Sequence, residues 1–233
     1  MINLNYLTRG FQEAFRLLVT GDAGVYDIVG VSLLVALAST LLAASLGLPT
    51  GYVLATRRFP GRRLVITVLN TLLALPTVVV GLSVYAMLSR RGPFGFLDLL
   101  YTPGAMITGE TLLAIPIVAA FTLSAFRSID PRVTDTALTL GATPFQTLRL
   151  LISEARFGIL AAIVASFGRV IAEVGAAMML GGNIKGSTRT MTTAIALETN
   201  KGEFGLAIAL GLILLCTAFA VNILFHWLQG FSD

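Results

Sequence analysis

Charged residues are scarce in this sequence of 233 amino acids. Lysine, arginine, aspartate and glutamate together make up 12% of the chain, whereas an average soluble domain holds about 25%. Hydrophobic residues make up 56%, and the mean hydropathy is +0.87. So few charges cannot cover the surface of a water-soluble fold, which excludes an ordinary soluble enzyme, a disordered chain and a coiled coil. The composition therefore predicts an integral membrane protein.

Cysteine, histidine and catalytic sequence patterns are also nearly absent. The single cysteine, Cys216, excludes an internal disulfide and a multi-cysteine metal site, and the apolar run around it predicts a small buried side chain. His226, the only histidine, is expected to anchor a helix end at the membrane interface rather than to bind a metal. There is no HExxH motif, nucleophile elbow or phosphate-binding loop, so we expect no metal site and no ATP hydrolysis by this chain. The net charge of +4 is spread over loops without a clustered basic face, which excludes a nucleic-acid binder.

Long apolar runs are what the sequence does contain. A helix that crosses a bilayer needs about 20 mostly apolar residues, and five stretches meet this requirement. They are Ile28–Leu54, Leu64–Leu88, Gly104–Phe126, Phe157–Leu180 and Phe204–Leu228. Gly47 and Gly51 have GxxxG spacing, which lets helix backbones approach closely, although glycine is also common in such helices generally. Residues 28–233 are thus predicted to form one all-α membrane domain with five transmembrane helices.

The N-terminal residues 1–27 have a different pattern. Five apolar residues recur at helical spacing among polar ones: Leu4, Leu7, Phe11, Phe15 and Leu18. This predicts an amphipathic helix that lies in the membrane interface, with packing against the bundle as the alternative. The segment lacks the basic start and the small-residue cleavage site of a signal peptide.

The polar segment between the third and fourth apolar stretches, about residues 127–156, carries the most specific local pattern. Asp130 can cap a helix that starts at Pro131, and Gly141 suits its end because glycine tolerates left-handed backbone geometry. The run Thr143-Pro144-Phe145-Gln146 then supplies the N-cap, first residue and capping-box partner of a second helix. The pattern predicts two short helices joined at a sharp turn, a polar hairpin outside the bilayer that is suited to pushing on another protein.

This hairpin resembles the EAA loop of ABC importer permeases, in which Glu-Ala-Ala, three residues and Gly precede a second helix. Two features depart from that pattern: Asp and Thr replace the first Glu and Ala, and Ile152–Arg156 lacks the usual closing Leu-Pro. The resemblance implies a loop that docks into a cytoplasmic ATPase subunit, with the N-terminus outside and the C-terminus in the cytoplasm. The expected coupling residues are Asp135, Thr136, Ala137, Gly141, Ala142, Thr143, Pro144 and Phe145. Loop charge does not decide the orientation, because the two sides would hold almost equal numbers of basic residues.

Four further segments are similar to the oxyanion branch of these permeases, which transports molybdate, sulfate or tungstate. They are Leu75–Gly81, Arg90–Gly95, Phe167–Gly175 and Gly182–Met191. The run Gly181–Phe204, together with Glu154–Gly158, is most similar to the tungstate type, with molybdate and sulfate as the alternatives. A secondary transporter and a non-transport membrane module are competing classes, but neither accounts for the two-helix polar loop.

The resemblance implies a type I ABC importer permease in the inner (plasma) membrane of a prokaryote. Its expected partners are a second copy of the chain, two cytoplasmic ATP-binding cassette subunits, an extracytoplasmic oxyanion-binding protein and the lipid bilayer. ATP and Mg²⁺ are expected on the ATPase subunits, and no cofactor is expected on this chain.

Ionisable residues inside a membrane are costly and are therefore functional candidates. Arg169 and Glu173 are four residues apart in the fourth stretch and can pair on one helical face, while Glu110 lies about six residues into the third. These residues either hold the bundle together or line the translocation path as a gate. An unpaired arginine would attract an oxyanion and a glutamate would repel it, so we expect passage to be tuned rather than the anion to be held tightly.

Prolines and an outer loop complete the candidate set. Pro76 and Pro116 kink their helices either as hinges or as fixed bends, and Gly81 near Pro76 favours local flexibility. Asn183, Thr188 and Thr190, with Thr192, offer hydrogen-bond donors at the outer mouth to an anion or to a docked binding protein. The alternative for this segment is an ordinary solvated loop.

Overall fold

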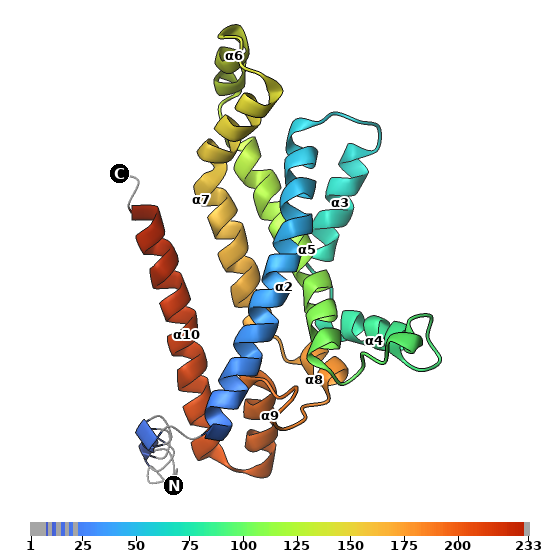
Figure 1. The fold of residues 1–233 in the computed structure, drawn as a ribbon, viewed down its shortest axis with the longest axis vertical. Helices are drawn as coiled ribbons and strands as arrows, with labels where there is room; N and C mark the ends of the chain where they lie inside the picture. Colours follow the sequence, from blue (N-terminus) through green and yellow to red (C-terminus); the bar gives the residue numbers. More distant parts are fainter. Residues whose placement is uncertain (1–7, 9–10, 13–14, 17–18, 21–22, 231–233) are drawn as a thin grey trace.

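A computed structural model describes residues 8, 11–12, 15–16, 19–20 and 23–230, and in this part of the chain it contains helices and no strand. Figure 1 shows an elongated bundle with a hairpin at one end. The elements are α2 (Ala23–Thr56), α3 (Arg62–Leu72), α4 (Thr77–Leu88), the short 3-10 helix η1 (Gly95–Leu97), α5 (Pro103–Arg127), α6 (Pro131–Thr139), α7 (Pro144–Ile171), α8 (Gly175–Gly181), α9 (Met191–Lys201) and α10 (Phe204–Gly230). The all-α prediction is confirmed.

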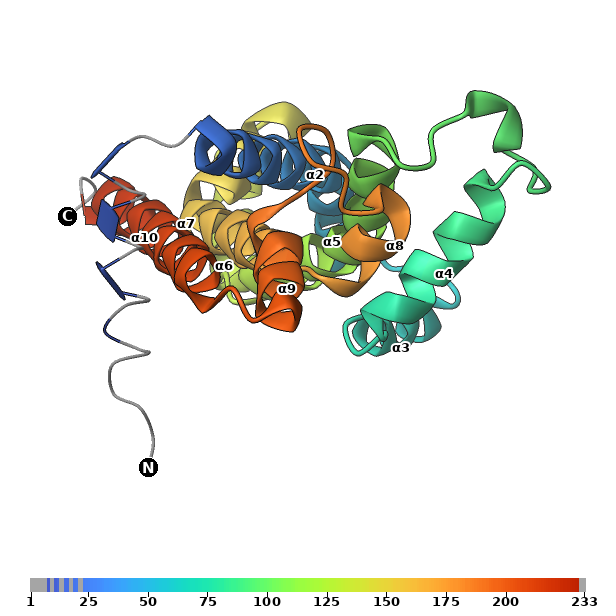
Figure 2. The same ribbon diagram turned by 90° about the horizontal axis from the view of Figure 1, so that it is seen from below.

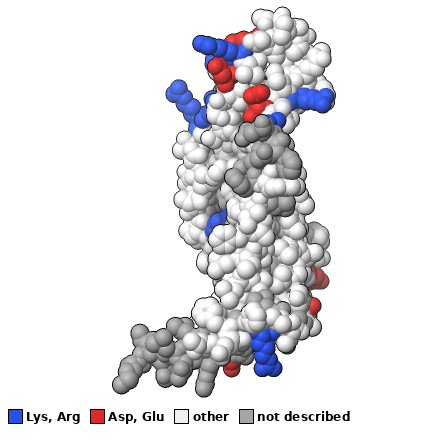
Figure 3. Space-filling model, turned by 90° about the vertical axis from the view of Figure 1, so that its left-hand side faces the viewer, with Lys and Arg blue, Asp and Glu red and all other residues white. Residues whose placement is uncertain are grey.

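Four helices, α2, α5, α7 and α10, are long and apolar enough to cross a membrane. The bent pair α3 and α4 is a fifth span only if the two helices are counted as one. Figure 3 shows the corresponding charge distribution, with charged side chains gathered toward the two ends and a long belt between them that is nearly free of charge. The first span starts at Ala23, earlier than the predicted Ile28. The amphipathic helix predicted for residues 1–27 otherwise lies largely outside the described residues.

The second predicted span, Leu64–Leu88, is not one kinked helix. α3 ends at Leu72 and α4 begins at Thr77, with a bend of 101° between them. Pro76 is the N-cap residue of α4, because proline has no N–H to donate and disfavours helical geometry in the residue before it. Figure 2 shows the result: α4 extends away from the bundle formed by α2, α5, α7 and α10. Pro116, in contrast, lies inside a continuous α5.

The fourth predicted span, Phe157–Leu180, is also displaced. α7 is one helix from Pro144 to Ile171, so the predicted second helix of the hairpin and the fourth span are a single element. No proline or glycine interrupts the sequence between Pro144 and Gly158. Beyond Ile171 the chain turns, and a separate short helix, α8, begins at Gly175. The hairpin is therefore attached rigidly to the span that follows it.

The core forms where α5 packs between α2 and α7. Small side chains such as Ala36, Ala43 and Ala114 are fully buried there, beside Val118 and Phe167. Small residues allow the close helix approach that membrane packing requires. α10 presents only one face to this bundle, and Cys216 on its other face is exposed in the protomer. The prediction of a buried cysteine is therefore wrong.

Candidate functional site

The hairpin that projects beyond the apolar belt is built by local capping. The Asp130 carboxylate accepts a hydrogen bond from the backbone N–H of Arg132 at 2.9 Å, which caps α6. Gly141 has a φ of 80°, the left-handed geometry that turns the chain after α6. The Thr143 N–H donates to Gln146 Oε1 at 2.8 Å, and the Gln146 N–H donates to Thr143 Oγ1 at 3.4 Å. Both caps and the intervening turn agree with the sequence prediction.

The tip of this hairpin presents apolar side chains to solvent. Phe145 is 74% exposed and Leu140 is 82% exposed, at the end of the molecule where Figure 1 places α6. Asp135 and Thr136 are exposed as well, whereas Ala137 is buried against the hairpin. A groove lined by Arg132, Val133, Thr136, Ala137, Leu140 and Leu150 runs beside them. The sequence analysis missed Leu140, although an apolar residue in an otherwise polar turn is the signal that would have found it.

Arg169 and Glu173 form an ion pair, with 2.7 Å between Arg169 Nη1 and Glu173 Oε2. They do not share a helix, because α7 ends at Ile171 and Glu173 lies in the turn before α8. Glu173 Oε1 accepts a hydrogen bond from the Ala176 N–H at 3.1 Å, so the carboxylate also caps the start of α8. The Glu173 side chain is 4% exposed and that of Arg169 is 42% exposed. The pair thus joins a buried carboxylate to a guanidinium that reaches the protomer surface.

Glu110 of α5 lies on the inner side of this pair. It is 2% exposed, and its Oε2 atom has no hydrogen-bond partner. Glu110 and Glu173 line the same cavity of about 10 Å³, here called the polar chamber. Its lining residues are Ser32, Val35, Glu110, Val170, Ile171, Glu173, Thr190 and Thr192. Ser32 was not predicted, and its Oγ accepts a hydrogen bond from the Met191 N–H at 2.7 Å. The structure places Glu110 inside one protomer rather than on its surface.

The segment predicted to offer donors at the outer mouth is folded and internally bonded. Thr188 is buried, its hydroxyl donates to the Gly181 carbonyl, and it accepts from the Ile184 N–H at 3.0 Å. Asn183 Oδ1 accepts from Arg189 Nε at 3.2 Å. The side chains of Asn183, Thr188 and Thr190 are therefore bonded within the protomer, while residues 184–187 between them are exposed. Their role at the outer mouth stays a prediction.

Thr190 is also bonded within the protomer, at the start of α9. It is buried and forms a capping box with Thr193 at the start of α9. The Thr192 hydroxyl donates to the Glu173 carbonyl at 2.7 Å, which ties α9 to the turn after α7. The threonines hold α9 in place because the first N–H groups of a helix need acceptors.

The helix that begins after Pro76, α4, packs against α8, the short helix that follows the turn after α7. A Cβ added to Gly175 would lie 3.1 Å from Val78 Cγ2 and 3.2 Å from Thr77 Oγ1. A Cβ on Gly81 would lie 3.0 Å from the Ala176 Cα. α4 and α8 are therefore closely packed at Gly81 and Gly175, next to the turn that holds Glu173.

Comparison with known proteins adds family relationships to this geometry. Residues 47–232 match the family model described as "Binding-protein-dependent transport system inner membrane component". The chain is 42% identical to the tungstate uptake system permease protein TupB of Peptoclostridium acidaminophilum, covering 97% of this chain and 99% of that protein. It is 44% identical to a probable anion ABC transporter permease protein of Haloferax volcanii, covering 85% and 88%. Its fold is similar to a crystal structure of a bacterial ABC transporter involved in the import of the acidic polysaccharide alginate, with a TM-score of 0.76, 20% identity and coverage of 100% and 91%.

Proposed function

Because the chain belongs to the family of binding-protein-dependent transport system inner membrane components, we propose that it is the membrane-spanning subunit of an ABC importer for tungstate. The observation that carries this proposal is the similarity to a tungstate uptake permease over 97% of the chain. The matched region covers nearly the whole chain, so the hairpin and Glu173 both lie within it. Molybdate and sulfate are the alternative substrates within the same class.

In this proposal two copies of the chain form the translocation path at their interface. The hairpin faces the cytoplasm, and its exposed Leu140 and Phe145 side chains enter a cleft in each of two ATPase subunits, which carry ATP and Mg²⁺. An extracytoplasmic binding protein delivers the oxyanion to the opposite end of the bundle. The N-terminus is then outside and the C-terminus in the cytoplasm.

α7 is the element that couples ATP to the path. Its 28 residues span about 42 Å at 1.5 Å per residue. One end begins beside Phe145 in the hairpin, and the other end carries Arg169. Because the helix has no internal break, a displacement of the hairpin is transmitted to the Arg169–Glu173 pair. ATP shifts the equilibrium between inward-open and outward-open states only by favouring one of them.

Arg169 supplies a positive charge for the passing anion. Its guanidinium is 42% exposed, while Glu173 holds it from the buried side. Glu173 competes with the oxyanion for the same guanidinium, so the site attracts the anion without retaining it. A weak, competitive site is what passage through a path requires.

The test is the ATPase activity of the reconstituted permease–ATPase complex with binding protein loaded with tungstate, molybdate or sulfate. Stimulation by the tungstate-loaded protein alone supports the proposal, and equal stimulation by all three widens the substrate to oxyanions in general. Phe145→Ala should reduce co-purification of the ATPase, whereas Phe219→Ala should not. Phe219 is 66% exposed and belongs to α10, a helix that lies apart from the hairpin helix α6 (Figure 1). An ATPase that fails to assemble with the parent chain would overturn the proposal.

A further inference from the structure

The polar chamber between α2, α5, α9 and the turn after α7 contains an imbalance of charge. Two carboxyl groups line it, those of Glu110 and Glu173, and no other ionisable side chain lines it within the described part of the chain. Arg169 does not line the chamber; it contacts the chamber only indirectly, by its ion pair with Glu173 Oε2. If both glutamates were ionised, one negative charge would stay uncompensated in the interior of a membrane bundle.

The hydrogen bonds of the two carboxyl groups show at which of them the negative charge would be uncompensated. Glu173 is satisfied as a carboxylate, because Arg169 Nη1 and the Ala176 N–H both donate to it. Glu110 Oε2 has no partner and is enclosed. The Ser39 hydroxyl is the one neighbour that supports a negative charge on Glu110, and it is outweighed by burial and by the charge of Glu173. A buried carboxylate with no cationic partner costs several kcal/mol in a low dielectric, and such a group is neutralised instead. A proton on Glu110 brings the sum of the three groups to zero.

We propose that the polar chamber is a proton-binding site, in which Glu110 is a neutral carboxylic acid that faces the Glu173 carboxylate. The chamber measures about 10 Å³, which is close to the space that one water molecule needs. One water can carry a hydrogen bond from the Glu110 O–H to Glu173, with hydroxyl groups of Ser32, Thr190 and Thr192 around it. The proton remains on Glu110, and no bond other than hydrogen bonds forms or breaks.

Protonated Glu110 can stabilise the negative charge of Glu173 when Arg169 does not. This role rests on the proposed transport function. When Arg169 turns toward a passing oxyanion, Glu173 loses its ion pair but stays buried. The Ala176 N–H and the water-relayed hydrogen bond from Glu110 then hold the carboxylate. Arg169 can therefore leave Glu173 without stranding an unpaired charge, and it can return after the anion has passed.

The site itself is tested without transport, by infrared spectroscopy of the purified full-length chain in lipid vesicles. The parent should show the carbonyl stretch of a protonated carboxylic acid, and Glu110→Gln should lose it. Glu198→Gln is the matched control, because Glu198 is also buried but is paired with Lys201 at 3.0 Å as a carboxylate. Glu173→Gln should shift the band of Glu110, because it replaces the group that accepts the hydrogen bond. The proposal would be overturned if the carbonyl band remained in Glu110→Gln, or if its frequency were unchanged in Glu173→Gln.

The role in transport is tested by pH. The proton on Glu110 is present at low pH and lost as pH rises, so stimulation of ATPase by the tungstate-loaded binding protein should fall in alkaline solution in the parent. The glutamine of Glu110→Gln has no such proton to lose. In this variant the stimulation of ATPase should therefore stay constant over the same pH range, when it is expressed relative to the variant's own value at neutral pH. Glu198→Gln should follow the parent. Parallel declines in the parent and in Glu110→Gln would overturn this role. If tungstate stimulates neither protein, the transport proposal fails while the infrared result still decides the proton site.

Discussion

Gly51 of α2 lies against the backbone of Ala119 in α5, so that a Cβ atom at position 51 would stand 2.6 Å from the Ala119 carbonyl oxygen. One turn earlier, a Cβ on Gly47 would stand 2.7 Å from the Val118 Cβ. Both glycines therefore lie on the face of α2 that touches α5. Their GxxxG spacing reflects a specific packing contact rather than the general frequency of glycine in membrane helices.

We predict that Gly51→Leu separates α2 from α5. The added side chain meets backbone atoms that cannot rotate away, and overpacking of this kind costs on the order of 1–3 kcal/mol or more. Gly30→Leu is the control on the same helix, because no atom lies within 4 Å of a Cβ there; we expect a change within about 0.5 kcal/mol. Thermal unfolding of both variants in detergent measures the difference. Equal losses would contradict the assigned contact.

The capping box at Thr143 gives a second prediction. Thr143→Val removes the acceptor for the Gln146 N–H and should weaken the start of α7 by about 1 kcal/mol. Thr147→Val is the control, because the Thr147 hydroxyl only bonds back to the Thr143 carbonyl within the helix. Hydrogen exchange at the hairpin should quicken in the first variant alone, and ATPase coupling should fall with it. Unchanged exchange in Thr143→Val would show that the cap is dispensable.

Local signals allowed the hairpin to be predicted from the sequence almost residue by residue. Asp130, Gly141 and Thr143 each act on the few residues around them, so their effect does not depend on distant packing. Apolar length likewise predicts the spans, because the requirement to cross a bilayer is a property of each segment alone.

The broken helices could not be predicted in the same way. Pro116 and Pro76 are the same residue type inside apolar stretches, yet Pro116 lies within a continuous helix and Pro76 lies at a break, as the N-cap residue of α4. The difference depends on what lies beside each, since α4 leaves the bundle to pack on α8 through Gly81. The turn that follows the end of α7 at Ile171 is likewise held by a tertiary contact, the Thr192 hydroxyl that donates to the Glu173 carbonyl.

The unequal exposure of Arg169 and Glu173 predicts unequal effects of their substitution. Arg169→Ala leaves a carboxylate that is 4% exposed without its ion pair. The loss should be about 1–3 kcal/mol, below the 3–5 kcal/mol of a fully buried pair, because Arg169 is 42% exposed in the protomer and the Ala176 N–H remains bonded to Glu173. Glu173→Gln should cost less, since the half-exposed guanidinium can be hydrated.

The double variant Arg169→Met/Glu173→Gln should recover part of the stability lost in Arg169→Ala, because it leaves no unpaired charge. Thermal unfolding of the three proteins in detergent measures this. Arg90→Gln, at an exposed arginine in the loop after α4, serves as the control for the loss of a positive charge. A double variant less stable than Arg169→Ala would mean that the pair is needed for more than neutralising Glu173.

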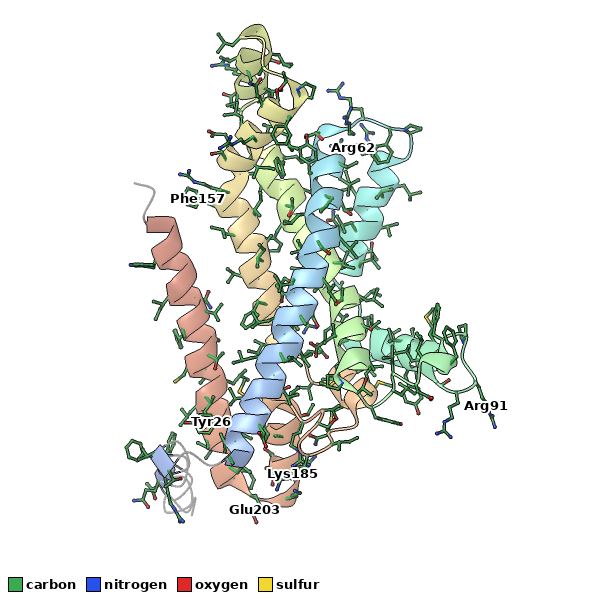
Figure 4. All side chains as sticks on the ribbon, viewed as in Figure 1. Tyr26, Arg62, Arg91, Phe157, Lys185 and Glu203 are labelled. Atoms are coloured by element: carbon green, nitrogen blue, oxygen red, sulfur yellow. The ribbon has the colours of Figure 1, made fainter. Side chains whose placement is uncertain are left out.

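The proposed orientation of the bundle rests on the docking role assigned to the hairpin and can be tested with single cysteines. Figure 4 places Arg62 at the hairpin end of the molecule and Lys185 at the opposite end. Cys216 is the only cysteine and is exposed, so Cys216→Ser provides a cysteine-free background. In intact cells an impermeant thiol reagent should label Lys185→Cys, and it should label Arg62→Cys only after the membrane is opened. Loop charge is nearly balanced between the two sides and does not decide the orientation, so this labelling decides whether the hairpin faces the cytoplasm, as the proposed docking role requires. The reverse pattern would place the hairpin outside the cell, where no ATPase subunit could bind it.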